Sequence, residues 1–145
     1  MDCTIDRPMK LFILFSFGGG LYSIVEILYK HDTHWSMFIL GGLCFLLVGG
    51  LNKIYTDMPL VVQMGISSLI ITALEFLCGC IVNIWLGWEV WNYDALPLNL
   101  FGQICIYFTV IWFFLSLVGI FVEDFLRWQL FYEKMPAYSI IKRKA

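Results

Sequence analysis

Charged residues are scarce in this chain of 145 residues: Asp, Glu, Lys and Arg make up 14% of it, whereas 61% is hydrophobic. A water-soluble domain usually carries about a quarter charged residues, so this chain has too little polar surface for water to cover. The mean hydropathy of +0.83 therefore indicates an integral membrane protein. With a net charge of −2 and no basic stripe, we expect no nucleic-acid partner.

Several sequence signals for other functions are also missing. The first apolar run has no small-residue cleavage site, so we expect a membrane helix there and not a removable signal peptide. No Gly-x-x-x-x-Gly-Lys-Ser/Thr loop is present to bind nucleotide phosphates. The five cysteines are an odd number, and all but Cys3 lie in apolar runs, where thiols behave as small hydrophobes. We therefore predict no disulfide framework and no cofactor.

The apolar residues fall into four runs, each close to or above the roughly 20 residues that a helix needs to cross a bilayer. We predict an all-α integral membrane fold, an up-down-up-down bundle of four transmembrane helices with an aromatic outer loop between the third and fourth. The whole chain, 1–145, would form one transmembrane domain, with helices at about 10–30, 35–53, 58–86 and 99–127. Asp57 and Pro59 predict the start of the third helix, as cap and first-turn proline.

Lys and Arg are distributed very unevenly between the two ends of this predicted bundle. The end with both termini and the second loop has eight of them, and the opposite end has only Lys30. The eight are Arg7, Lys10, Lys53, Arg127, Lys134, Lys142, Arg143 and Lys144. Because basic residues stay on the cytoplasmic side of a membrane, we expect both termini in the cytoplasm.

Small and polar residues recur at every third or fourth position of the apolar runs, which places them on one face of a helix. In the third run they are Gly65, Ser68, Thr72, Glu75, Gly79 and Asn83. In the fourth they are Gly102, Cys105, Thr109, Trp112, Ser116, Gly119 and Glu123. Membrane helices meet through small residues and shared hydrogen bonds, so these faces should point into the bundle.

Helix packing does not explain the two acids within the apolar runs, Glu26 and Glu75. A carboxylate in hydrocarbon is costly unless it is paired, hydrated or protonated, so intramembrane acids mark functional sites by default. Both are expected in the outer half of the bundle, where they could share a site and a proton. The alternative is that both glutamates are structural hydrogen-bond acceptors. Near the cytoplasmic end, the four-residue spacing of Glu123 and Arg127 predicts a local ion pair.

The outer loop at residues 87–99 is rich in aromatic and amide side chains. Trp and Tyr favour the interface between lipid and water, so an interfacial turn is the simplest interpretation. The alternative is a re-entrant cap that brings Asn92 or Asp94 above Glu75, with Asn99 and Gln103 nearby. In the first outer loop, His31, Asp32 and His34 are metal-ligand types without a diagnostic spacing, and we predict no metal site. The candidate binding residues are Glu75, Glu26, Asn83, His34, Trp91, Asn92, Asp94, Asn99 and Gln103.

Four blocks of sequence resemble one bacterial family. They are residues 33–37 (Thr-His-Trp-Ser-Met), 71–76 (Ile-Thr-Ala-Leu-Glu-Phe), 90–93 (Val-Trp-Asn-Tyr) and 102–105 (Gly-Gln-Ile-Cys). Across nearly the whole chain the sequence resembles the "putative ABC-transporter type IV" membrane family, also called CmpB-like. Family members usually have Asp-Tyr-Ser after the loop tryptophan, whereas Trp91 is followed here by Asn92, Tyr93 and Asp94. The resemblance implies a permease of the bacterial plasma membrane whose ATPase would be a separate chain.

We therefore expect a membrane transport protein, either a permease subunit or a small carrier, that works as a homo-oligomer because four short helices enclose little volume. Glu75 would bind a cation or proton, Glu26 would be coupled to it, and Asn83, Asn92 and Asn99 would line an outer entrance. An outer-leaflet lipid-modifying enzyme is one alternative, with His34 and a glutamate as acid and base, although no nucleophile is apparent. A non-catalytic assembly or sensor protein is the other.

Overall fold

The computed structural model describes residues 5–141. Its helices are α1 (Arg7–Lys30), α2 (Trp35–Ile54), α3 (Leu60–Gly79), which continues into the π-helix η1 (Cys80–Trp85), and α4 (Ile106–Phe131). The short strands β1 (Asn99–Leu100) and β2 (Ile104–Cys105) pair in an antiparallel hairpin just before α4. Within residues 5–141, four helices are long and apolar enough to cross a membrane, which confirms the predicted all-α membrane bundle. Cys3 and the basic triplet 142–144 lie outside the described residues.

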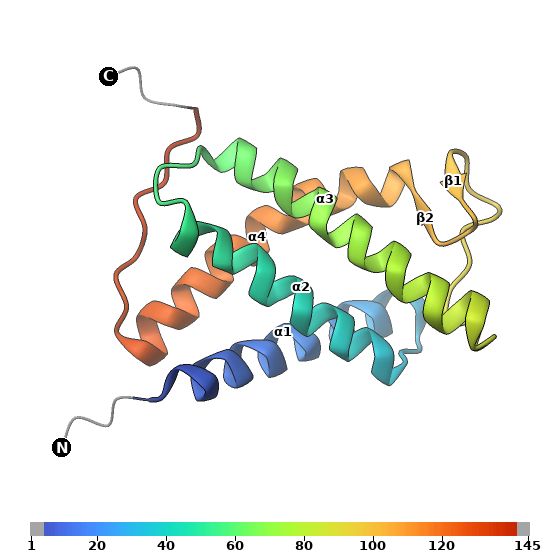
Figure 1. The fold of residues 1–145 in the computed structure, drawn as a ribbon, viewed down its shortest axis with the longest axis horizontal. Coiled ribbons are helices and arrows are strands. Elements are labelled where there is room, and N and C mark those ends of the chain that lie inside the picture. Colours follow the sequence, from blue (N-terminus) through green and yellow to red (C-terminus); the bar gives the residue numbers. More distant parts are fainter. Residues whose placement is uncertain (1–4, 142–145) are drawn as a thin grey trace.

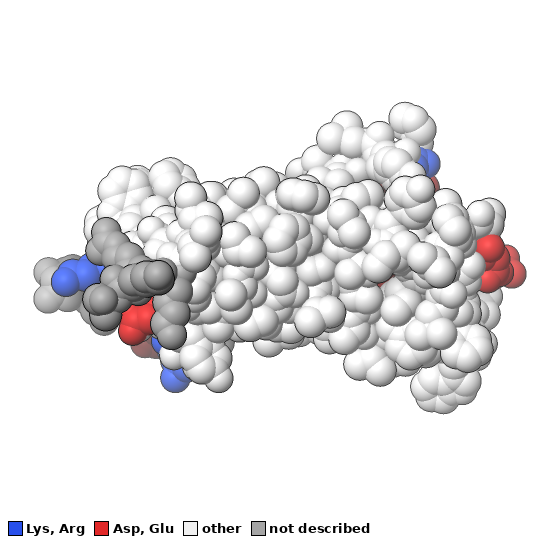
Figure 2. Space-filling view, turned by 90° about the horizontal axis from the view of Figure 1, so that it is seen from above, with Lys and Arg blue, Asp and Glu red and all other residues white. Residues whose placement is uncertain are grey.

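Successive helices run in opposite directions along the bundle (Figure 1). Both ends of the described chain lie at one end, here called the inner end, and the hairpin β1–β2 lies at the other, the outer end. On the face seen in Figure 2, charged side chains gather toward the two ends and most of the length between them is uncharged. Many large apolar side chains of the helices are exposed, among them Leu69 and Leu77 of α3, which are 67% and 58% exposed. Such a surface suits lipid and not water.

Helix α1 packs almost entirely on α2 and barely touches α4. Glycines allow the first two helices to approach closely. A methyl group added at Gly18 would collide with Phe45, and one at Gly41 would collide with Tyr22. Lipid provides no hydrophobic driving force for helix association, so the small residues at this seam stabilise the pair by allowing close van der Waals packing.

Hydrogen bonds join α3 to α4. The hydroxyl of Ser68 donates to the carbonyl oxygen of Thr109 at 2.6 Å, and the hydroxyls of Thr72 and Thr109 lie 3.1 Å apart. Near the inner half, the Ser116 hydroxyl is 2.8 Å from the carbonyl oxygen of Phe113 in its own helix, and 3.4 Å from that of Met64 in α3. Ser68, Thr72, Thr109 and Ser116 belong to the predicted polar stripes, and these members lie between α3 and α4, whereas Gly65 of the same stripe faces open space.

Residues 99–105 differ from the expectation, which placed them in the first turns of the fourth helix. They form the hairpin instead, and α4 begins at Ile106. Phe101 and Gly102 have φ angles of 52° and 68°, in the left-handed region that a right-handed helix excludes. The spacing of Gly102 and Cys105 matched a helical face, but Gly102 lies in the turn of the hairpin and Cys105 lies in β2.

The start of α3 also differs from the expectation. Asp57 makes no capping hydrogen bond, and Pro59 precedes the first helical residue, Leu60. The backbone N–H of Leu60 donates instead to the carbonyl oxygen of Ser139, at 2.7 Å. The segment after α4 therefore crosses the inner end of the bundle, as Figure 1 shows, and satisfies the first turn of α3.

Candidate functional site: two acids beneath an outer cap

Glu75 on α3 is 2% exposed and lies between the outer loop and α4. The hydroxyl of Tyr93 donates to its Oε1 at 3.0 Å, and the indole Nε1 of Trp112 donates to its Oε2 at 3.0 Å. Both donors are neutral, and no ion pair to Glu75 occurs within residues 5–141. Each oxygen of the carboxylate therefore accepts one hydrogen bond, and within the described residues neither has a positively charged partner.

Glu26 on α1 is 8% exposed and has partners of its own. Its Oε1 lies 2.6 Å from the Lys30 ammonium, and its Oε2 accepts from the Thr33 hydroxyl at 2.8 Å. No hydrogen bond joins Glu26 to Glu75 in the described chain. With Lys30 matched to Glu26, one carboxylate of the pair, Glu75, is left without a counter-charge.

The loop after η1 folds back over the outer end of α3. Trp91 is 7% exposed, and its Nε1 donates to the carbonyl oxygen of Gln103 at 3.0 Å. The amide of Asn83, in η1, donates to the Gln103 side-chain oxygen at 2.8 Å and accepts from the Val90 N–H at 2.7 Å. Gly79 allows the loop to pack closely on α3, since a methyl group at this position would collide with Gln103 and Trp91. Of the two interpretations of this loop, the arrangement supports a re-entrant cap and not a simple interfacial turn.

Asn92, Asp94 and Asn99 hold the cap in shape and form no hydrogen bond to Glu75. Asn92 and Asp94 are exposed and bond to each other, with side-chain and backbone contacts of 2.9 and 2.7 Å. The Asn99 amide donates to the Leu96 carbonyl oxygen at 2.8 Å. Tyr93, which lies between Asn92 and Asp94 in the sequence, is the residue that reaches Glu75. We expected an amide or an acid of this loop to approach Glu75, but the group that bonds to it is the phenol of Tyr93.

Two residues absent from the candidate set, Tyr93 and Trp112, thus provide both hydrogen bonds to Glu75. Burial, followed by the charge of Glu75, raises the pKa of the Tyr93 phenol, which keeps its proton and remains a donor. Its ring also stacks on Phe108 with centroids 4.7 Å apart. The sequence did contain a signal for each residue. Trp112 lies on the polar stripe of the fourth apolar run, and Tyr93 lies in residues 90–93, one of the blocks that resemble the family.

His34 begins α2 as its N-cap, and its Nδ1 accepts from the Ser36 N–H at 3.2 Å. Its ring lies 5.3 Å from both Trp35 and Trp88. Beside it is a polar cavity of about 360 Å³, the outer polar cavity, whose walls include Lys30 and Thr33, the two partners of Glu26. His34 therefore lies in the wall of this cavity, and within the described residues it forms no hydrogen bond to Glu75. Within residues 5–141, no three His, Cys, Asp or Glu side chains are grouped to hold a metal ion.

A second group of charges lies at the inner end. Glu123 and Asp124 on α4 are buried at 0% and 1% exposure. The predicted ion pair is confirmed, with Arg127 Nε lying 2.6 Å from Glu123. Asp124 Oδ2 accepts from Asn52 at 2.7 Å and from the Tyr138 hydroxyl at 2.8 Å. These contacts fasten α2, α4 and the C-terminal segment to one another.

Glu133 completes this inner network just after α4. Its carboxylate lies 3.2 Å from Lys10, 3.3 Å from Lys53 and 3.5 Å from Arg127. Burial alone would raise the pKa of Glu133, but the hydrogen bonds and charges of these cations outweigh it and lower the pKa below its ordinary value. Glu133 is therefore ionised near neutral pH and links α1, α2 and α4.

Comparison with known proteins gives one family and no individual relative. No curated protein and no solved structure matches the chain. A family model matches residues 10–141, which include almost all of α1, the cap with its two acids beneath it, and all of α2, α3 and α4. This multi-pass membrane protein therefore belongs to the family described as "putative ABC-transporter type IV".

Proposed function

We propose that this chain is a membrane transport protein, a permease subunit or small carrier, in which Glu75 binds a cation or a proton. The observation that carries the proposal is that Glu75 is 2% exposed and held by two neutral donors, Tyr93 and Trp112. An unmatched carboxylate in a membrane bundle is too costly to keep unless a cation or proton joins it. Binding and release at this position would supply the coupling that transport needs.

The surrounding residues have separate roles in this proposal. Glu26, matched by Lys30, acts beside Glu75, and its own partners Lys30 and Thr33 line the outer polar cavity. Asn83, Gln103 and Trp91 hold the cap over the site. Asn92, Asp94 and Asn99 keep the hairpin in the conformation that directs Tyr93 inward, and His34 shapes the wall of the outer polar cavity.

We further propose that the inner end faces the cytoplasm of a bacterial cell, so that both termini are cytoplasmic and the cap faces outward. The eight-to-one distribution of basic residues supports this orientation in the plasma membrane. The transmembrane domain would act as a homo-oligomer, since the bundle encloses little volume. In the permease alternative, as opposed to the carrier, energy would come from an ATPase on a separate chain that contacts the inner end.

The test is charge movement in reconstituted protein. Wild type, Glu75→Gln and Asp57→Asn are placed in liposomes on a solid-supported membrane, and currents are recorded after jumps in proton or sodium concentration. We expect currents in wild type and in Asp57→Asn, whose exposed carboxylate lies in the inner loop away from the proposed site, and none in folded Glu75→Gln. Equal currents in wild type and Glu75→Gln would show that Glu75 is a structural acceptor and overturn the proposal.

A further inference from the structure

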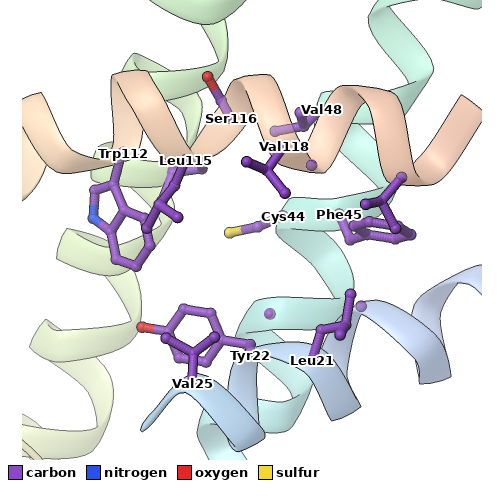
Figure 3. A pocket seen from close by; sticks show the side chains of 15 residues that line it. Leu21, Tyr22, Val25, Cys44, Phe45, Val48, Trp112, Leu115, Ser116 and Val118 are labelled. Carbon is purple, nitrogen blue, oxygen red and sulfur yellow. The ribbon is translucent and has the colours of Figure 1, made fainter. Parts of the chain in front are cut away.

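An apolar cavity of about 230 Å³ lies between α1, α2 and α4 (Figure 3). Leu21 and Val25 of α1 face Leu115 and Val118 of α4 across it, and Phe45 of α2 closes one end. Because α1 and α4 barely touch, the cavity opens between them toward the region that lipid would occupy. A ligand could therefore enter it from the bilayer without passing the outer cap.

The other end of the cavity is formed by two stacked aromatic rings. The rings of Tyr22 and Trp112 lie 5.8 Å apart with their planes 26° from parallel. In Figure 3 the tyrosine oxygen and the indole nitrogen both point to the α3 side. That nitrogen donates to Glu75, so a single indole forms the cavity wall on one side and binds the carboxylate on the other.

The charges around this wall favour a positive ligand. Glu26 is neutralised by Lys30, whereas Glu75 has no ion pair in the described chain. Aromatic faces attract cations, most strongly when the cation is out of water. A metal ion would need several oxygen ligands, whereas the lining is mostly apolar and the Ser116 hydroxyl points away from the cavity toward backbone carbonyls of Phe113 and Met64. A cation that carries its own apolar groups suits both the lining and the charge.

We propose that this cavity binds a small lipophilic organic cation, such as a quaternary ammonium with apolar substituents. The apolar groups lie among the α1 and α4 side chains, and the positive charge lies against Tyr22 and Trp112, facing Glu75. The inference deepens the proposed function by naming the class of cation, and it rests on that function for the role of Glu75. A lipid acyl chain is the competing occupant, because it would fit the lining but would not need the carboxylate.

The first test is equilibrium binding of radiolabelled benzyltrimethylammonium to wild-type protein in lipid nanodiscs. The competitor is neopentylbenzene, which has the same shape with carbon in place of the charged nitrogen. We expect unlabelled benzyltrimethylammonium to compete about tenfold or more better than the neutral compound. Equal competition would overturn the inference and assign the cavity to lipid chains. This comparison needs no variant and so does not depend on how a mutation folds.

Two variants then locate the site. Glu75→Gln removes the charge and should weaken binding of benzyltrimethylammonium about tenfold or more, with the neutral compound unaffected. Gly119→Phe fills the cavity, since a methyl group at Gly119 meets only Val48, at 4.0 Å. We expect it to abolish binding, whereas the control Gly20→Phe, at an open position outside the cavity, should bind like wild type. Unchanged binding in folded Gly119→Phe would contradict the inference.

The two proposals fail in different ways. If proton or sodium currents require Glu75 but benzyltrimethylammonium binding does not, the inference is wrong and the proposed function stands. If binding requires Glu75 and the open cavity but no ion or ammonium moves across the membrane, the cation site stands and transport is wrong.

Discussion

Trp112 of α4 donates its indole hydrogen to Oε2 of Glu75 on α3, at 3.0 Å. This bond crosses between two helices in the outer half of the bundle, and Tyr93 approaches the other oxygen of the same carboxylate from the cap. Glu75 is thus the point at which α3, α4 and the outer loop meet. A change in the charge of Glu75, or the binding of a cation to it, would therefore affect the packing of all three segments.

Removing the indole donor should destabilise the protein without changing its shape greatly. Trp112→Phe keeps an aromatic ring but leaves Glu75 Oε2 without its partner, so we expect a loss of about 1–2 kcal/mol in unfolding free energy. Denaturant titration in detergent micelles measures it. Trp85→Phe is the control, because Trp85 is 79% exposed, and it should be nearly neutral. Equal stability of the Trp112 variant would mean that this bond contributes nothing to the fold.

The glycine seam between α1 and α2 should tolerate no added methyl group at its closest contact. Gly41→Ala would press on Tyr22, and we expect a cost of about 1–3 kcal/mol, typical of an overpacked core. Gly20→Ala, on the same pair of helices but with open space around it, should be neutral or slightly stabilising. The same titration compares them, and two equal values would contradict the role of the seam.

The hairpin in the cap depends on Gly102 for two reasons that can be separated. Its φ of 68° is strained for other residues by about 1–2 kcal/mol. In addition, a methyl group there would collide with Asp94. Gly87 has a similar φ, 66°, but nothing near its missing side chain. We expect faster amide hydrogen exchange across residues 91–105 in Gly102→Ala than in Gly87→Ala, measured by mass spectrometry. Equal exchange in the two variants would mean that backbone strain explains the whole effect and that the collision with Asp94 contributes nothing.

Acid should weaken the inner network through Glu133. Because the folded protein lowers the pKa of Glu133, the ionised form favours folding. Its contribution is complete above the unfolded pKa of about 4.3 and disappears as the pH falls through the lower folded value. We expect Glu133→Gln to be less stable than wild type at pH 7 by up to about 1 kcal/mol, since these pairs are partly exposed. The difference should vanish in acid, and a difference that persists there would exclude this origin. Glu89→Gln is the control.

Hydropathy and periodicity were sufficient to predict the four helices, because each span and its inward stripe are local properties of the sequence. The start of α4 was not predictable in this way. Gly102 fits a helical stripe by spacing, yet it lies in a turn against which the side chains of Asn92 and Asp94, eight to ten positions earlier, pack closely. Glu75 was evident as a buried acid, but its donors lie 18 and 37 positions away. Spacing within one helix does not say which residue of another segment faces it.

The near-exclusive packing of α1 on α2 has a consequence for biogenesis. Nearly all of the contacts that hold α1 are with the next helix in the chain. The first helical hairpin can therefore assemble as soon as α2 has entered the bilayer, before α3 and α4 are synthesised. The second hairpin needs more of the chain, because Ser139 supplies the acceptor for the first turn of α3. Insertion should then proceed in two stages, and a stalled chain that ends after α2 should already contain a packed helical pair.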